Sequence, residues 1–454
     1  MLLLTFTLLI PIIALALVIA LEKRFARQIT IAATLAELLL SIFLIYEMHF
    51  SGLSFSYSYL YGSITIPFSL SLVPISAILL FMSVAVILSV AISSSNSSKA
   101  VYSLLLLLQA SAAGLFESSN LFFFFIFWDV GVISAFFMIY LFGSPQREQA
   151  AIKFIIYEAA ASIMLLFAII LIYYSTGTAG IKSLSLYHSN YSFAIFFLML
   201  FAFMINMGIF PFHFWLPDAY GEASTEGSMA ISAIVSKFGA LGSFYLLAMF
   251  SNYSHYIAAI AIFSAFYASF MMIRERDIKR IVAYASMLDM SLILFALTPG
   301  NALSNAGAAY SMLSHGLAIS LLFLAAGSIE YVSGTRNIRL MEGIAKLSKS
   351  TAYIFIAAVL LLFGLPLGSG FIADLLIFMG AVQSFGAYGL LLLLPILIAE
   401  AFFYYVIARS MFVAHEEPKP VNYLDAGTKH AYALLLSLIL LFGLMPFIFL
   451  SIFK

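Results

Sequence analysis

The chain has 454 residues, of which 64% are hydrophobic and 9% are charged. A soluble domain carries about 25% charged residues, so this composition excludes an ordinary soluble protein and indicates that lipid covers much of the surface. The 20 basic and 20 acidic residues cancel, so no basic balance points to a nucleic-acid partner, and we expect none. The lack of cysteine excludes disulfides, thiolate zinc sites and cysteine-bound iron–sulfur clusters. We therefore expect no cofactor in this chain.

Apolar runs long enough to cross a bilayer recur from one end of the sequence to the other. A membrane-spanning helix needs about 20 such residues. The first run, residues 1–21, lacks the basic start of a signal peptide and is too long for its core, so we interpret it as the first span. Because the loops are short, we expect an all-α polytopic membrane protein that forms one domain over residues 1–454. The predicted spans, about fourteen, are 2–21, 29–49, 67–93, 101–117, 120–142, 151–174, 193–211, 229–250, 254–273, 278–298, 303–331, 351–367, 371–413 (a half-helix followed by a full span) and 429–452.

Basic residues mark alternate loops. Lys23, Arg24 and Arg27 lie in the first predicted loop, whereas the even-numbered loops are nearly free of charge apart from Lys182. Positive loops stay on the cytoplasmic side of a membrane, so the odd loops are predicted to be cytoplasmic and both termini outside. Further basic residues of the odd loops are Arg147, Arg274, Arg276, Lys279, Arg280, Arg336, Arg339, Lys346, Lys349 and Lys419.

The loop at residues 51–66, SGLSFSYSYLYGSITI, differs from the others in its pattern. Polar and apolar residues alternate along it, which is the period of a half-buried strand. We expect a β-hairpin on the outer side.

Two predicted spans contain helix breakers near their middle. One is NMGIFPFHFWLPDAYG around Pro211, and the other is LFGLPLGSGFIADLL around Pro366. About five spans separate them, and an odd offset places equivalent helices in opposite orientations. This pattern predicts two inverted repeats, residues 101–250 and 251–413, whose broken helices mark an ion site. Two ordinary proline kinks are the alternative interpretation.

Ionisable side chains recur inside the predicted spans, where each one costs a few kcal/mol. Asp129 lies among phenylalanine and tryptophan, and Lys237 is in the middle of its span, where a lysine can carry protons. His315 can relay protons near neutral pH, although a lone histidine is often an ordinary core residue. Glu158 and Glu400 fit a relay and a salt bridge equally well. The candidate proton-translocating residues are Asp129, Glu158, Lys237, Asp289, His315, Asp374 and Glu400.

Five segments occur in the order FPFHFWLPDAY, SAIVSKFGALG, ERDIKRIVAYASM, MLSHGLAISLLFLAAG and GLPLGSGFIADLL. Together they resemble the antiporter-like subunits of respiratory complex I, of Mrp-type Na⁺/H⁺ antiporters and of membrane-bound hydrogenases. The resemblance covers about residues 100–410 and is closest to the second of the three large complex I subunits or its hydrogenase counterparts. It implies fourteen spans, two inverted five-helix repeats and a polar axis at mid-membrane.

The resemblance also implies roles for individual residues. Members of the family pair a glutamate on the fifth span with a lysine on the seventh; Asp129 holds the first position and Asn206 the second. Because an amide cannot ionise, either Lys237 pairs with Asp129, or this chain conducts differently or not at all. The more acidic axis would also suit Na⁺. The remaining family positions on the axis are held by Lys237, Asp289, His315 and Asp374.

The predicted function is that of a proton-translocating membrane subunit in a prokaryotic cytoplasmic membrane. The complex would be a complex I-like NADH or ferredoxin:quinone oxidoreductase, or a membrane-bound hydrogenase. Its partners would be other membrane subunits and, through the complex, hydrophilic iron–sulfur subunits. The alternatives are a Mrp-type Na⁺/H⁺ antiporter subunit, a structural subunit that does not pump, and a lone solute transporter. No dinucleotide loop, P-loop or metal-ligand spacing occurs, so any enzyme activity would belong to the whole translocase.

Overall fold

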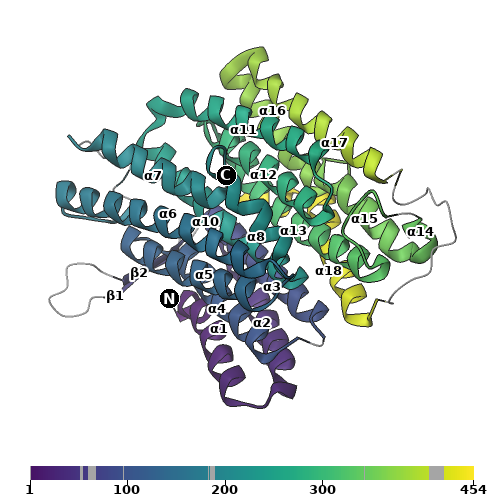
Figure 1. Cartoon of the computed structure of the whole chain (residues 1–454). Helices are drawn as coiled ribbons and strands as arrows, with labels where there is room; N and C mark the ends of the chain where they lie inside the picture. Colours follow the sequence, from purple (N-terminus) through teal and green to yellow (C-terminus); the bar gives the residue numbers. More distant parts are fainter. Residues whose placement is uncertain are drawn as a thin grey trace.

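Helices that run side by side make up most of the protein (Figure 1). This computed structural model describes residues 2–51, 55–59, 68–95, 97–181, 184, 190–341, 343–407, 409 and 424–453. In chain order the elements are α1 (Leu2–Ala20), α2 (Lys23–Ser51), β1 (Phe55–Tyr59), β2 (Phe68–Leu72), α3 (Pro74–Ser93), α4 (Lys99–Glu117), α5 (Leu121–Leu141), α6 (Arg147–Thr176), α7 (Ser192–Met207), the 3₁₀ turn η2 (Phe212–Trp215), α8 (Leu216–Glu222), α9 (Thr225–Ala230), the π-helical turn η3 (Ile231–Val235), α10 (Ser236–Met249), η4 (Ser251–Tyr253), α11 (Ser254–Arg274), α12 (Ile278–Leu297), α13 (Ala302–Ser333), α14 (Ile344–Leu347), α15 (Lys349–Leu362), α16 (Ser369–Phe385), η5 (Gly386–Leu392), α17 (Leu393–Ile407), α18 (Ala426–Leu444), α19 (Phe447–Leu450) and η7 (Ser451–Phe453).

The predicted all-α polytopic fold is confirmed. Within the described residues, thirteen helical segments are long and apolar enough to cross a membrane. Thirteen of the fourteen predicted spans overlap one of them. The exception is 351–367, where α15 has 14 residues and ends at a break. The two inverted repeats stay a prediction.

The predicted hairpin is present, but its second strand comes later than expected. β1 and β2 pair antiparallel, with Phe55 opposite Leu72. The third span was predicted to start at residue 67, yet its helix begins at Pro74, a residue that favours the first helical turn. The five residues before it, FSLSL, alternate in the strand period and bury Leu70 and Leu72. Residues 52–54 and 60–66 of the predicted hairpin lie outside the described part of the chain.

Both predicted helix breaks are present and share one local cause. α7 ends at Gly208, whose φ is +67°, and α15 ends before Gly364, whose φ is +74°. Glycine takes this left-handed conformation without steric cost, so it is the usual residue past a helix end. In each case a proline follows within three residues, Pro211 or Pro366, and prevents the helix from continuing. The chain resumes as η2 and α8 after the first break, and as α16 after the second.

Four segments form the interior of the bundle. Their membrane-spanning windows are 89–100% buried: α3, the continuous α9–η3–α10 segment, α12 and α13. Four helices lie at the periphery, and only 28–33% of their membrane-spanning windows is buried: α1, α2, α16 and α18. An ionisable side chain on an inner helix is therefore shielded from lipid and meets only other protein groups.

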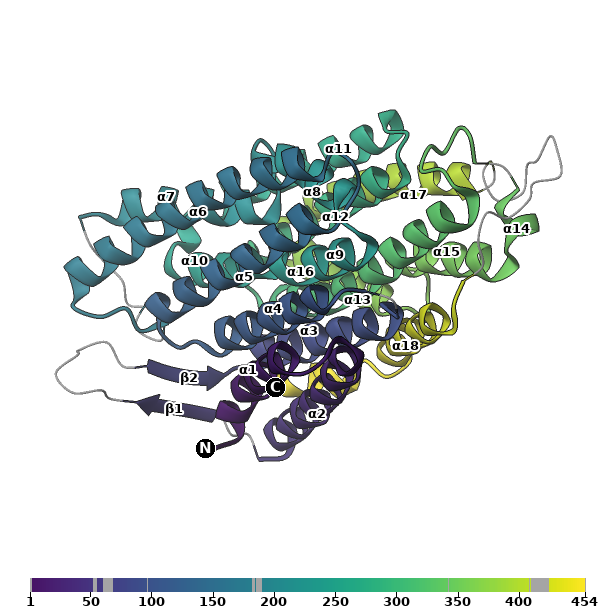
Figure 2. The same ribbon diagram turned by 60° about the horizontal axis from the view of Figure 1, so that its bottom comes forward.

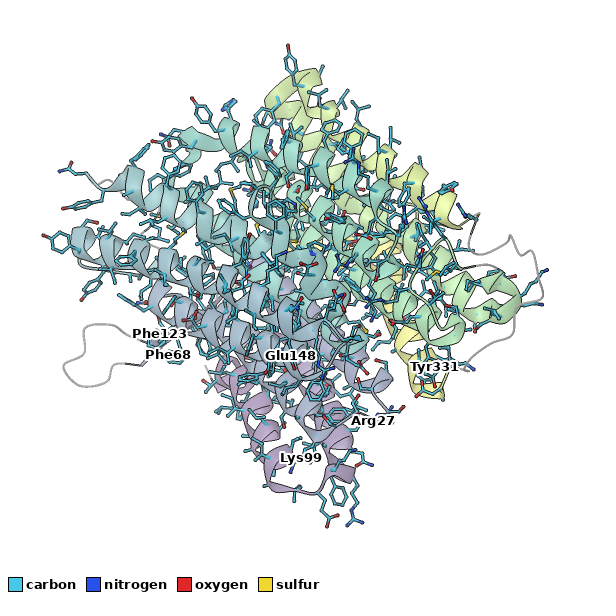
Figure 3. All side chains as sticks on the ribbon, in the orientation of Figure 1. Arg27, Phe68, Lys99, Phe123, Glu148 and Tyr331 are labelled. Atoms are coloured by element: carbon cyan, nitrogen blue, oxygen red, sulfur yellow. The ribbon has the colours of Figure 1, made fainter. Side chains whose placement is uncertain are left out.

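The two ends of the bundle differ in charge. Figure 2 shows the hairpin at one end and α14 at the other, and Figure 3 places Phe68 and Phe123 toward the first end and Arg27 and Tyr331 toward the second. We call the second the basic end, because the described basic residues of the predicted odd loops lie there. Arg336 crosses this end, donating to the Gly221 carbonyl at 2.7 Å. Lys182 and Lys419 lie outside the described residues.

Ion pairs tie the helices together at the basic end. Arg336 contacts Asp277 at 2.9 Å and Glu222 at 3.3 Å, so it joins the start of α12 to the end of α8. Burial raises the pKa of Asp277 above its usual value even though the Arg336 guanidinium favours the charged carboxylate. The other pairs are Lys153–Asp218, Lys279–Glu330, Arg280–Asp218 and Arg280–Glu222.

Candidate proton pathway

Lys237 is placed at the centre of the bundle by a local change of helix type. The segment α9–η3–α10 changes from α-helix to π-helix over Ile231–Val235 and returns to α-helix at Ser236. Single π-helical turns are rare and occur mostly at functional sites, because the extra residue re-aims the side chains that follow. The Lys237 side chain comes directly after this turn and is 0% exposed.

Lys237 and His315 are in direct contact. The Lys237 Nζ hydrogen-bonds to His315 Nδ1, and it also donates to Ser236 Oγ at 3.2 Å and lies 3.9 Å from Met290 Sδ. The other ring nitrogen of His315, Nε2, lies 3.1 Å from Ser286 Oγ. A hydrogen bond between two basic nitrogens needs one donor and one acceptor, so this pair holds one shared proton.

Moving a proton through this pair takes two steps. With Lys237 protonated, His315 accepts at Nδ1 and carries its hydrogen on Nε2, which then donates to Ser286. Transfer of the proton to Nδ1 makes His315 an imidazolium that donates from both nitrogens, and after the proton on Nε2 has left, Nε2 can accept from the Ser286 hydroxyl. The contact therefore has the geometry of a proton-transfer step.

A small cavity lies beside His315. Asp289 of α12, Asp374 of α16, and Ser311 and Ser314 of α13 line it together with the histidine. Its volume of about 10 Å³ is close to the space one water molecule needs. The second helix break places Asp374 here, because α16 starts at Ser369, whose hydroxyl lies 2.9 Å from that of Ser314.

A second polar group lies between α5, α6, α7 and α10. Asn206 donates to both carboxylate oxygens of Glu158, at 3.1 and 3.3 Å, and its own oxygen accepts from the Gly239 N–H at 2.8 Å. One helical turn after Glu158, Ser162 donates to Asp129 at 2.5 Å. Asn206 thus connects a buried carboxylate to the helix of Lys237, two residues from the lysine itself.

Gly239 is required for that connection. A Cβ at this position would lie 2.9 Å from the Asn206 side-chain oxygen and 2.8 Å from the Phe203 carbonyl oxygen. α7 and α10 can approach this closely only because glycine has no side chain.

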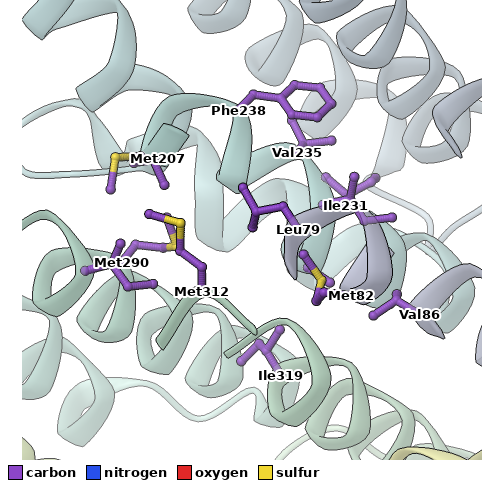
Figure 4. Close-up of a cluster of buried hydrophobic side chains, with 14 of the residues drawn as sticks. Leu79, Met82, Val86, Met207, Ile231, Val235, Phe238, Met290, Met312 and Ile319 are labelled. Atoms are coloured by element: carbon purple, nitrogen blue, oxygen red, sulfur yellow. The ribbon is translucent and has the colours of Figure 1, made fainter. Parts of the chain in front are cut away.

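Apolar side chains surround the lysine and histidine. They come from six segments that meet at the centre of the bundle. Figure 4 shows part of this cluster, including Leu79 and Met82 of α3, Met207 of α7, Val235 of η3, Phe238 of α10, Met290 of α12 and Met312 of α13.

A row of buried serines runs from the basic end to Lys237. Ser228, Ser232 and Ser236 are 0% exposed, and each donates to the carbonyl four residues earlier, at 3.0, 2.6 and 2.8 Å respectively. The row starts at Ser224, and it covers about 18 Å of helix before it reaches Lys237 through Ser236. We call Ser224, Ser228, Ser232 and Ser236 the serine ladder.

A polar cavity of about 550 Å³ lies at the outer end of the serine ladder. The first turn of α9, at Thr225 and Glu226, forms part of its wall together with Asp425. Burial would raise the pKa of Asp425, but hydrogen bonds from Ser95 and Thr428 outweigh it and hold the pKa below its usual value. This carboxylate therefore stays ionised at neutral pH and makes the cavity attractive to cations.

The structure brings some of the predicted residues together and separates others. Lys237, His315, Asp289 and Asp374 form one connected group around the cavity. Asp129 and Glu158 form a second group along α6. The alternative in which Lys237 pairs with Asp129 is wrong for this structure, since Lys237 contacts His315 and Asp129 contacts Ser162. The side chain of Glu400 lies outside the described residues.

Several polar residues of these groups were not predicted. The serine ladder has a visible signal, because serine recurs every fourth residue in SMAISAIVSK and its preceding turn, a spacing that places all four on one helix face. The hydroxyls of Ser162, Ser286 and Ser311 have no such signal, because their roles depend on contacts between helices far apart in sequence. Within the described residues, no group of three or more histidine, cysteine, aspartate or glutamate side chains could hold a metal ion.

The chain matches the family model described as NADH:quinone oxidoreductase/Mrp antiporter, TM, over residues 118–402. It is 30% identical over 364 residues to the F(420)H(2) dehydrogenase subunit M of Methanosarcina mazei, an alignment that covers 76% of this chain and 73% of that protein. The match to NAD(P)H-quinone oxidoreductase chain 4 1 of Synechococcus elongatus covers only 52% of that protein.

Two solved structures show the same fold. A chain of respiratory complex I from Thermus thermophilus superposes with a TM-score of 0.89 at 22% identity, covering 98% of this chain and 96% of the other. A chain of the Mrp complex from Dietzia sp. gives a TM-score of 0.90 at 20% identity, with 99% and 96% covered. At this level of identity the likeness establishes the fold alone. The family match and the sequence identity to the Methanosarcina protein establish membership: this chain belongs to the NADH:quinone oxidoreductase/Mrp antiporter family, as an antiporter-like, multi-pass membrane subunit.

Proposed function

We propose that this chain translocates protons through a pathway centred on Lys237 and His315. The observation that carries the proposal is their direct contact, buried between the serine ladder on one side and the two-carboxylate cavity on the other. Buried ionisable groups are costly and need a purpose. A lysine and a histidine that share one proton can pass it on with small movements of either side chain.

The exit side uses the cavity beside His315. Once the imidazole has taken the proton from Lys237 on Nδ1, it can release one from Nε2 toward Ser286 or from the ring into a water in the cavity. That water would lie among Asp289, Asp374 and two serine hydroxyls, all of which accept hydrogen bonds. The two carboxylates are the acceptors we assign to this step.

The entry side uses the serine ladder. Serine hydroxyls often bond to the carbonyl four residues earlier in membrane helices, and alone this has no functional meaning. Here the row extends from a polar cavity to Lys237, and each hydroxyl is bonded to the carbonyl one turn earlier, so we assign the transfer between successive hydroxyls to a bridging water at each turn. The ladder therefore supplies Lys237 from the basic end.

Glu158 is the acid that we assign to the other half of the molecule. Asn206 cannot carry charge, but it donates two hydrogen bonds to this carboxylate and links it to the helix of Lys237. Asp129 of α5 accepts a hydrogen bond from Ser162, which lies on α6 one turn after Glu158. We propose that Glu158, with Asp129 beside it, replaces the usual glutamate–lysine pair of the family.

The complex to which the chain belongs is proposed to be driven by a redox reaction. The 30% identity to a subunit of an F(420)H(2) dehydrogenase supports this choice over a Mrp-type antiporter. The partners would be other membrane subunits and hydrophilic iron–sulfur subunits, in a prokaryotic cytoplasmic membrane. A Mrp-type antiporter subunit is the second candidate, because the fold is equally close to a Mrp chain. Asn206 favours a third, a structural subunit that does not pump.

Replacing Lys237 with methionine should stop proton translocation. Lys237→Met keeps the side-chain length and removes the proton carrier, and the loss of a proton-transfer group slows a step by about 100-fold or more. We expect donor-driven acidification in proteoliposomes of the intact complex to fall at least about tenfold. Lys99→Met, which alters a lysine bonded to the Ile19 and Leu21 carbonyls, is the matched control and should retain the activity. Unchanged pumping in an assembled Lys237→Met complex would refute the role of this lysine.

Replacing Glu158 with glutamine tests the other half of the molecule. Glu158→Gln keeps an oxygen that can accept from the Asn206 amide, but it cannot exchange a proton. Because a positioned proton-transfer group speeds a step by about 100-fold or more, we expect pumping to fall at least about threefold. Glu117→Gln is the matched control, because Glu117 is equally buried and bonded to Thr7, away from the pathway. Equal pumping by Glu158→Gln and wild type would show that this half is structural.

Removing two hydroxyls tests the serine ladder. The double variant Ser232→Ala, Ser236→Ala removes two hydroxyls of the ladder. The helix itself should be preserved, because alanine favours the helical conformation. We expect proton flux to fall several-fold and its H₂O/D₂O rate ratio to change, because proton supply becomes limiting. Ser89→Ala, at another buried serine bonded to its own helix, should change neither. A Ser236→Thr variant, which keeps a hydroxyl at this position, should retain the flux. If the double variant changed neither the flux nor the H₂O/D₂O rate ratio, the ladder would be excluded as the entry route.

A further inference from the structure

A cavity of about 590 Å³ opens at the basic end between α11 and α17, which pack side by side (Figures 1 and 2). It lies away from the proton pathway. Its walls combine two kinds of side chain, arginines at the end of the bundle and apolar residues along the two helices. Ligand pockets of this size are typical for small molecules and lipid head groups.

Four arginines surround the cavity: Arg274, Arg276, Arg339 and Arg409. None of them forms an ion pair with another described residue, whereas four other basic residues of the same end, Lys153, Lys279, Arg280 and Arg336, each pair with an acid. Four arginines without an acidic partner in the described part of the chain therefore meet at one cavity.

One acid also lines the cavity, and it is already engaged. Glu275 Oε1 accepts hydrogen bonds from the backbone N–H groups of Arg276 and Asp277, at 2.7 and 3.1 Å. With Glu275 counted as a full negative charge, the four arginines still leave a formal charge of +3 around the cavity. Guanidinium groups bind phosphate through paired, parallel hydrogen bonds, so they suit a phosphate ligand better than lysines would.

The other walls of the cavity are apolar. Ile273 of α11 and Ile398, Ala401 and Phe402 of α17 form them. Tyr405 stands between the two zones and accepts a hydrogen bond from Arg409 at 3.0 Å, which holds that guanidinium toward the cavity. Tyrosine is enriched at this level of membrane proteins, where one end of the ring is apolar and the other is wet.

We infer that this cavity binds an anionic phospholipid, with its phosphate on the arginines and the start of its acyl chains along α11 and α17. A free phosphate would satisfy the arginines but leave the apolar walls uncovered. A zwitterionic phospholipid would cover the walls but leave the positive charge uncompensated. The anionic lipid satisfies both, as basic pockets between helices on the cytoplasmic side of membranes do.

The test uses the intact complex in nanodiscs and a phosphatidylglycerol with a photoreactive acyl chain. We expect labelling of peptides from α11 or α17 that unlabelled phosphatidylglycerol suppresses and phosphatidylcholine does not. The double variant Arg274→Gln, Arg339→Gln should weaken the labelling at least about tenfold, since each basic residue contributes about a fivefold factor to anionic lipid binding. The control Lys23→Gln, Arg24→Gln removes the same charge from the exposed start of α2 and should leave the labelling unchanged.

Other outcomes would overturn the inference. Suppression by inorganic phosphate alone would indicate a soluble anion site. Equal suppression by phosphatidylcholine, or equal labelling of both double variants, would indicate ordinary surrounding lipid. Protection of these peptides by an acidic segment of a partner subunit, detected by cross-linking in the assembled complex, would indicate a protein interface.

Discussion

The contact between Lys237 and His315 is the interaction around which the interior is organised. A charged lysine in a low-dielectric interior must have polar partners, because water cannot reach it. The structure supplies them from three inner segments: Ser236 beside the lysine, His315 on α13, and Ser286 on α12 behind the histidine. Apolar side chains close around this chain of bonds. Because apolar side chains neither donate nor accept protons, a proton that enters this chain of hydrogen bonds can move only along it.

Irregular backbone at three places builds this arrangement. The π-helical turn sets the direction of Lys237, and the second break brings the first turns of α16 and Asp374 to the cavity beside His315. The first break ends α7 just after Asn206, where the amide can bond both Glu158 and Gly239. Each irregularity costs regular hydrogen bonds and is stabilised by packing in the interior. The ion pairs of Arg336 join the two halves of the chain at the basic end, next to the first break.

The sequence predicted the spans, the breaks and most of the ionisable residues for clear physical reasons. Long apolar runs, a glycine followed by a proline, and a charge in such a run are local signals that do not depend on tertiary contacts. The partners of those charges were not predictable. One of the alternatives paired Lys237 with Asp129, yet Lys237 meets His315, 78 positions later in the chain. The start of α3 was placed too early because hydrophobicity alone does not separate the strand Phe68–Leu72 from the helix that follows it.

We propose that this antiporter-like subunit belongs to a redox-driven complex, and the composition of that complex is the most direct test of the proposal. An affinity tag on this chain, mild-detergent purification from native membranes and mass spectrometry would identify the proteins that accompany it. We predict stoichiometric iron–sulfur subunits together with other membrane subunits, and proton uptake by the reconstituted sample when its electron donor is added. Recovery of small membrane subunits only, with Na⁺/H⁺ exchange and no redox-driven proton movement, would contradict the account and identify a Mrp-type antiporter.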